Sequence, residues 1–245
     1  MIDGYIICAT PRSGSTLFCQ YLASTGVAGV PASYFRNENL HEYAELWKIL
    51  RPDGSYDFAD YLEATRKVGS TRNGVLALRI MWSSLEEVMA YLARLYPDLA
   101  DNEVTLLERA FGRLKFIYLR REDVVAQAIS LYRASQTGYW HIDEGQAPEQ
   151  PPAFDFDAIN SLVAELRRDN LDWQSWFGRV SVQPMPVVYE DFAADPRTTV
   201  SEVLRFLETE LPADTELKAS NQRLADETTT LWLKRYGEEL EKRTT

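Results

Sequence analysis

Short, nearly continuous apolar runs alternate along the chain with longer segments whose apolar residues recur at helical spacing. The first run ends at Ala9, and later runs fit residues 74–80, 114–119 and 186–189. Runs of this kind suit parallel strands that are covered on both faces. Strands that alternate with helices predict an α/β fold, a mostly parallel sheet flanked by helices. We expect one domain over residues 1–245, because no repeat or low-complexity linker interrupts the pattern.

Helical spacing fills most of the intervals between these runs. A stretch with Gly, three prolines and several acids, residues 138–152, instead predicts a mobile loop or lid. The helices are predicted from residue 17, over residues 38–50, 57–67, 85–95, 101–111, from residue 122, over residues 156–177 and 200–207, and from residue 226.

The composition limits the expected cellular location of the protein and its expected partners. No apolar run reaches membrane-spanning length, and no basic region precedes a long apolar stretch at the start, so we expect a cytoplasmic protein without membrane insertion. Cys8 and Cys19 offer neither a disulfide framework nor metal-ligand spacing. The net charge of -11 disfavours nucleic acid as a partner, so any anionic ligand must meet a local cluster of donors.

The first strand passes into the first helix through a loop of small and turn-forming residues. Such a loop presents free backbone N–H groups and the positive end of the helix dipole to an anion. Against the phosphate-binding pattern G-x-x-x-x-G-K-[ST], Ala9 stands at the first glycine and Ser15 at the lysine. Because that lysine reaches the outer phosphates of a nucleoside triphosphate, its absence favours a shorter anion, one phosphate or phosphosulfate. The predicted binding residues are Arg12, Ser13, Gly14, Ser15 and Thr16.

A second loop-to-helix junction carries a similar set of groups. The third strand ends in Arg120 and Arg121, and Ser130 lies on the helix that follows. If both junctions lie at one edge of the sheet, they bind two phosphates of a single nucleotide. The residues alone therefore predict an anion-binding α/β domain with two positively charged sites.

The two junctions together resemble motifs of sulfotransferases that use 3′-phosphoadenosine 5′-phosphosulfate (PAPS). Residues 10–17 look like their 5′-phosphosulfate loop, and residues 116–121 with Ser130 are similar to their 3′-phosphate motif. Further stretches resemble the bacterial trehalose 2-sulfotransferase family, namely residues 29–35, 73–82, 134–140, 189–191, 222–226 and 232–236. The resemblance implies a P-loop-like fold, sulfuryl transfer from PAPS to a hydroxyl of a small carbohydrate or polar metabolite, no metal, and a homodimer.

The resemblance also implies roles for single residues. Arg12 and the loop N–H groups neutralise the leaving 5′-phosphate, while Arg121 and Ser130 select the 3′-phosphate. Hydroxyls of Ser15 and Thr16 add donors at the transferred group. The remaining implied residues are Gln222 and Arg223, which close over the nucleotide, and Tyr34, Phe35 and Trp140, whose rings would stack on a sugar.

The chain departs from the family at the acceptor side. The family pattern Gly-Glu-Pro-x-Glu-Tyr-Phe has its general base at the second Glu, where this chain has Ser33. A serine, with a pKa far above neutrality, cannot replace a carboxylate as base. Either Glu38, His41 or His141 substitutes for it, or the acceptor site is rebuilt, or the protein binds the nucleotide but turns over poorly.

Two other functions stay open at this point. A P-loop kinase of a small metabolite would need the lysine that is absent at Ser15. A nucleotide-binding or sensor protein derived from the enzyme family would explain the carboxylate missing at Ser33. A milder departure lies on the second strand, where the family has lysine and this chain has Arg79, which keeps the charge and alters the geometry.

Overall fold

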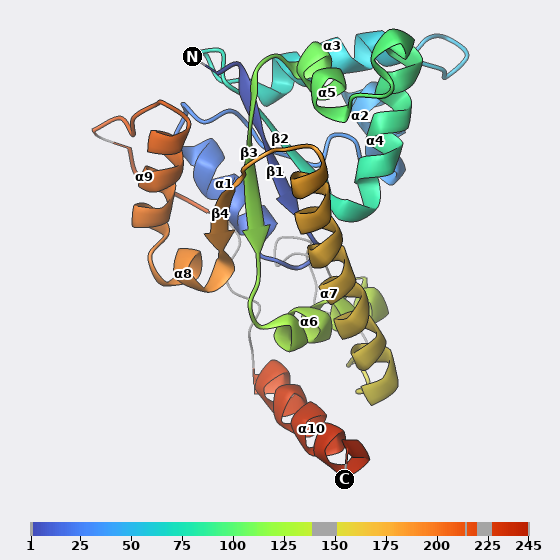
Figure 1. The fold of residues 1–245 in the computed structure, drawn as a ribbon, viewed down its shortest axis with the longest axis vertical. Coiled ribbons are helices and arrows are strands. Elements are labelled where there is room, and N and C mark those ends of the chain that lie inside the picture. The colour runs from blue at the N-terminus through green and yellow to red at the C-terminus, as the bar shows by residue number, and fades with distance from the viewer. Residues whose placement is uncertain (1, 139–150, 214, 220–226, 245) are drawn as a thin grey trace.

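A computed structural model describes residues 2–138, 151–213, 215–219 and 227–244 of the chain (Figure 1). Four strands form one parallel sheet in the order β2-β1-β3-β4. Their bounds are β1 Gly4–Ala9, β2 Leu76–Met81, β3 Leu114–Arg120 and β4 Met185–Val188. The predicted α/β class, a parallel sheet flanked by helices, is confirmed.

Helices connect the strands and cover both faces of the sheet (Figure 1). The α-helices are α1 Ser15–Ser24, α2 Leu40–Leu46, α3 Phe58–Gly69, α4 Trp82–Leu95, α5 Glu103–Phe111, α6 Val124–Thr137, α7 Phe156–Arg179, α8 Tyr189–Ala194, α9 Pro196–Phe206 and α10 Glu227–Thr244. Two short 3₁₀ turns, η1 Asn37–Asn39 and η2 Pro97–Leu99, precede α2 and α5. Among the described residues, no helix combines the length and the apolar character that crossing a membrane requires.

Strand β1 shows how the sheet is buried. All six of its residues are buried, because successive side chains point to opposite faces and both faces are covered. Ile6 and Cys8 join the core formed with α2, α3, α4, α5 and the later part of α7. Tyr5, Ile7 and Ala9 join the core formed with α1, α8 and α9. A continuous apolar run therefore specifies the central strand.

Helix α7 links the sheet to a third apolar cluster. Its first half, with Ile159 and Leu166, packs with residues of α6 and α10. Its second half packs on the sheet, where the fully buried Trp173 donates a hydrogen bond of 3.0 Å from its indole Nε1 to the carbonyl of Ala9. Because Ala9 ends β1, this bond ties α7 to the carboxyl edge of the sheet.

The strand order places two loops side by side at that edge. From β1 the chain runs to β2 on one side, whereas β3 pairs with β1 on the other. In open parallel sheets such a reversal of strand order opens a crevice where ligands bind. The loop after β1 and the turn between β3 and α6 both lie at this point, so the two predicted anion sites share one edge.

Most predicted elements agree with the structure to within a few residues, with two differences. The helix predicted over residues 38–50 is only η1 and α2, and Lys48 has a φ of 60°, which does not continue a helix. Tyr189, predicted at the end of a strand, instead begins the short helix α8. The predicted lid lies largely outside the described residues.

Candidate active site

The loop between β1 and α1 leaves the start of a helix uncapped. Gly14 occupies the N-cap position with a φ of 83°, and no side chain in the described part of the chain caps α1. The first N–H groups of a helix have no partner within the helix, so these groups are available to bind an anion. Ser13 is fully buried, and its Oγ has no hydrogen-bond partner among the described residues. An anion would satisfy both kinds of donor.

Gly14 is required here for two reasons. Its φ lies in the left-handed region, which side chains with a Cβ rarely adopt. In addition, a Cβ at this position would lie 2.2 Å from Cδ2 of the Tyr189 ring. The first residue of α8 therefore supports the loop directly by packing against its backbone.

Arg79 brings a positive charge to the loop from the neighbouring strand. The β1–β2 register pairs Arg79 with Ile7, near the carboxyl end of β1. Its Nη1 lies 2.9 Å from Oγ1 of Thr16 and 3.3 Å from Oγ of Ser15, and donates to both. Its Nε donates to Oγ of Ser33 at 2.8 Å. Because these three acceptors are neutral hydroxyls, the guanidinium keeps its charge available for an anion.

Sequence reasoning noted Arg79 as a substitution without placing it in the site. The signal that finds it is its position on β2, since a parallel neighbour of β1 ends at the same edge of the sheet. Arg79 thus contacts the predicted hydroxyl residues Ser15 and Thr16. It also contacts Ser33, where the chain departs from the family pattern.

Arg12 joins the two predicted motifs. It adopts a φ of 61°, and its Nε donates a hydrogen bond of 3.0 Å to Oγ of Ser130 on α6. The contact shows that the loop after β1 and the helix after β3 lie against each other. Ser130, predicted as a partner of Arg121, contacts Arg12 in this structure.

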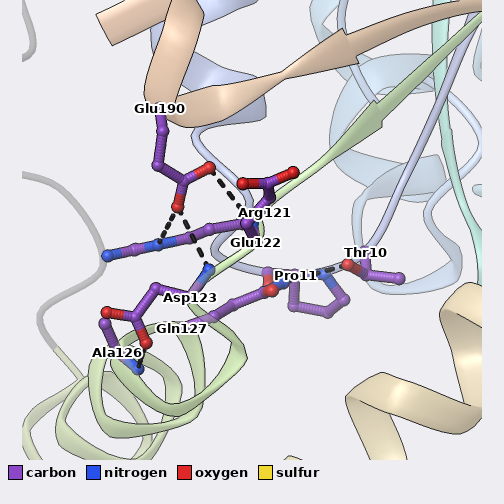
Figure 2. Close-up of polar contacts among 8 residues, drawn as sticks. All are labelled: Thr10, Pro11, Arg121, Glu122, Asp123, Ala126, Gln127 and Glu190. Carbon is purple, nitrogen blue, oxygen red and sulfur yellow. Dashed lines mark hydrogen bonds and ion pairs between the residues drawn. The ribbon is translucent and has the colours of Figure 1, made fainter.

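Arg121 contacts two residues of α8, Tyr189 and Glu190, and Figure 2 shows its position beside Glu190. Its Cζ lies 4.9 Å from the centroid of the Tyr189 ring, and its Nε lies 3.9 Å from Oε1 of Glu190. The Glu190 carboxylate also accepts hydrogen bonds from the backbone N–H groups of Glu122 and Asp123, at 3.1 and 3.2 Å. The Arg121 side chain is mostly buried, and its Nε has no hydrogen-bond partner among the described residues. Figure 2 shows the guanidinium end of Arg121 extending past the Glu190 carboxylate.

The chain is similar to known proteins over most of its length. The model of a family described as Stf0 sulphotransferase matches residues 4–239 of the chain. This chain belongs to that family. The sulfotransferase has relatives named trehalose 2-sulfotransferase in Mycobacterium tuberculosis (strain ATCC 35801 / TMC 107 / Erdman) and Mycolicibacterium smegmatis (strain ATCC 700084 / mc(2)155).

These relatives match nearly the whole chain. The first is 29% identical over 258 residues, which cover 96% of this chain and 94% of the relative. The second is 29% identical over 260 residues, which cover 95% and 93%. Among solved structures, the sulfotransferase domain from the Synechococcus PCC 7002 olefin synthase aligns with a TM-score of 0.47 and 18% identity, over 85% of this chain and 74% of that one. Membership of the family decides for a sulfotransferase over the kinase alternative.

The structure places two predicted sugar-binding residues of the sulfotransferase in its core. Tyr34 and Phe35 are both buried. The Tyr34 hydroxyl donates to the carbonyl of Val30 at 2.7 Å, and burial raises its pKa. Phe35 packs edge-on against Tyr61 and Phe111. Their faces are occupied by protein, so this packing does not support the predicted contact with a sugar.

The predicted bases among the described residues face solvent. Glu38 is 70% exposed and pairs with Arg36 at 3.0 Å, and hydrogen bonds from its own backbone N–H and from Arg36 lower its pKa. His41 is exposed on α2. A carboxylate with a lowered pKa is a weaker base, so the assignment of Glu38 stays a prediction without support from its surroundings. The other predicted residues, Trp140, His141, Gln222 and Arg223, lie outside the described residues.

Proposed function

We propose that this sulfotransferase moves the sulfuryl group of PAPS to a hydroxyl group of a sugar. The observation that carries the proposal is the uncapped start of α1 beside Arg79, whose guanidinium binds the hydroxyls of Ser15 and Thr16. A helix N-terminus with an adjacent cation suits one compact anion such as a phosphosulfate. The absence of the usual lysine from this loop argues in the same direction.

The donor would span the two loops at the edge of the sheet. We assign its 5′-phosphosulfate to Arg12, Ser13 and Gly14, with Arg79 at the transferred group. Arg121 then takes the 3′-phosphate at the neighbouring turn. The contact between Arg12 and Ser130 supports this arrangement, because it holds the two loops close enough for one nucleotide to reach both.

Transfer would depend mainly on positioning and on stabilising charge. The acceptor oxygen attacks sulfur, the bond between sulfur and the 5′-phosphate oxygen breaks, and negative charge develops on the leaving phosphate. Donors that are held beside the oxygen between sulfur and the 5′-phosphate before the reaction stabilise the transition state. Arg79 suits this role because hydrogen bonds to three hydroxyls hold its guanidinium in place. The proton of the acceptor hydroxyl needs a base, for which Glu38, His41 and His141 stay candidates.

The relatives guide the choice of acceptor and setting. Because both are named trehalose 2-sulfotransferase, a hydroxyl of trehalose is the first acceptor to test. The net charge of -11 disfavours a polyanionic acceptor. A cytoplasmic location belongs to the same proposal and is compatible with two cysteines that are free thiols. The homodimer and the single domain stay predictions.

Labelled sulfate transfer from PAPS to trehalose tests the proposal, together with calorimetry of 3′-phosphoadenosine 5′-phosphate (PAP). We expect PAP binding that weakens in Arg12→Ala and Arg121→Ala and is unchanged in Arg113→Ala, an exposed arginine paired with Asp3. A protein that binds no PAP would refute the donor assignment.

A second candidate is a PAP- or PAPS-binding protein with lost catalysis. It is favoured by Ser33, which accepts a hydrogen bond from Arg79 where the family pattern has a carboxylate. Tight PAP binding without transfer to any sugar tested would support this candidate.

A further inference from the structure

We propose that Gln127 is a positioning residue that holds the loop after β1 in its anion-binding conformation. The inference rests on the proposed function, because it concerns the 5′-phosphosulfate end of the donor. Gln127 lies on α6, one turn before Ser130, and is fully buried. Neither the loop motif nor the arginine motif includes it.

Two hydrogen bonds join Gln127 to the loop (Figure 2). Its Nε2 donates to the carbonyl of Pro11 at 2.6 Å and to Oγ1 of Thr10 at 2.9 Å. A carbonyl can only accept, so the bond to Pro11 fixes which end of the amide faces the loop. The amide therefore binds the two residues that come directly before Arg12.

The loop needs such a support because its backbone is unusual. Arg12 and Gly14 both have positive φ, and Arg12 pays a steric cost that glycine does not. Proline has no N–H, so the backbone of Pro11 can be held only through its carbonyl. Gln127 supplies that bond, and Ser130 on the same face of α6 binds the Arg12 side chain.

Helix α6 is itself anchored at its start. The Glu190 carboxylate accepts from the N–H groups of Glu122 and Asp123, and Asp123 caps the helix by accepting from the N–H of Ala126 at 2.8 Å. Because α6 is fixed at the turn that carries Arg121, Gln127 fixes the loop after β1 relative to that turn. One helix therefore sets the positions of both phosphate sites.

Calorimetry with three nucleotides separates the two ends of the site. Adenosine 5′-phosphate probes the loop, adenosine 3′-phosphate probes the turn at Arg121, and PAP probes both. Gln127→Met keeps the side-chain length and removes both donated hydrogen bonds. The matched control is Gln136→Met, also on α6, which removes two hydrogen bonds to Ala153, far from the loop in the sequence.

We expect Gln127→Met to weaken PAP and adenosine 5′-phosphate binding about tenfold and to leave adenosine 3′-phosphate unchanged. Gln136→Met should change none of the three. Thr10→Val removes one loop acceptor and should cause a smaller loss with the same selectivity, and the double variant should be no weaker than Gln127→Met. If Gln127→Met does not fold, Thr10→Val alone tests the inference.

Two outcomes overturn the inference while the proposed function stands. The first is wild-type PAP binding with unchanged affinity for adenosine 5′-phosphate in Gln127→Met and Thr10→Val. The second is an equal loss for the 5′- and 3′-phosphates, which indicates general destabilisation. If the wild-type protein binds none of the three nucleotides, the proposed function itself is refuted.

Discussion

Replacing Gly14 by alanine tests how the loop after β1 is supported. The added methyl group meets the Tyr189 ring at 2.2 Å, and the residue must keep a φ of 83°. A positive φ costs about 1–2 kcal/mol for a residue with a Cβ. Overpacking against a buried ring adds about 1–3 kcal/mol. Gly14→Ala should therefore destabilise the protein by about 2–5 kcal/mol, because the two costs act together.

Gly26→Ala is the matched control for this experiment. Gly26 has a φ of 69°, but apart from its two chain neighbours no atom of the described residues lies within 4 Å of where its Cβ would stand. Gly26→Ala should therefore lower the free energy of unfolding only by the cost of the positive φ, about 1–2 kcal/mol. The reduced entropy of the unfolded chain applies to both substitutions and cancels in their difference. That difference isolates the contact with Tyr189.

Urea denaturation followed by circular dichroism measures both variants, and PAP calorimetry measures the site. We expect Gly14→Ala to be less stable than Gly26→Ala by about 1–3 kcal/mol, and PAP binding to weaken only in Gly14→Ala. In a double-mutant cycle, Gly14→Ala should cost less stability in the Tyr189→Ala background than in the wild type, because the ring that the methyl group meets is already absent. Equal stability and equal PAP affinity in the two alanine variants would refute the packing of α8 against the loop.

Three further predictions concern charge at the site and on α7. Arg79→Ala should lower the rate of labelled sulfate transfer about 100-fold, and Arg79→Lys should fall in between because it keeps the charge but not the three hydrogen bonds; an unchanged rate in Arg79→Ala would contradict its role. Ser33→Glu should weaken PAP binding in calorimetry, because a carboxylate would pair with Arg79, and raise the transfer rate about tenfold or more by supplying a base; tighter PAP binding would exclude that pairing. Burial and the nearby Glu165 raise the pKa of Asp169 from 3.8 to about 6, so the folded state holds its proton more tightly and loses stability as pH rises between these values. Because Asp169 is only half-buried, Asp169→Asn should stabilise the protein by about 1 kcal/mol at pH 7 and by almost nothing near pH 4 in thermal unfolding.

The sheet could be predicted because its strands are short apolar runs that differ clearly from the residues before and after them in the sequence. Turn-forming residues mark the ends of these runs. They follow Ala9, where β1 ends, and precede Leu114, where β3 begins. Helix α8 could not be predicted, since its six residues are too few to show helical spacing. The sequence also places Tyr189 in an apolar stretch, which fits a strand as well as the first turn of a helix.

The donor side of the site was easier to predict than the acceptor side for a physical reason. An anion-binding loop is a local feature, so the consecutive residues 12–16 are enough to predict it. The convergence of Arg79 with Ser33 depends on strand register and on a separate loop, which no local pattern records. Aromatic residues such as Tyr34 suit a sugar site and a core equally, and only burial decides between them.

The charge distribution explains why these arginines must be held individually. A protein with a net charge of -11 repels an anionic nucleotide at long range, and salt confines that repulsion to a Debye length of about 8 Å. Within that range the local groups decide, and the guanidinium groups of Arg12, Arg79 and Arg121 lie at one edge of the sheet. Arg12 is fixed by Ser130, Arg79 by hydroxyls of the loop, and Arg121 by the Tyr189 ring and Glu190. Because the hydroxyls that hold Arg79 are neutral, its positive charge stays available to the ligand, and α6 and α8 hold Arg12 and Arg121 where two phosphates can meet them.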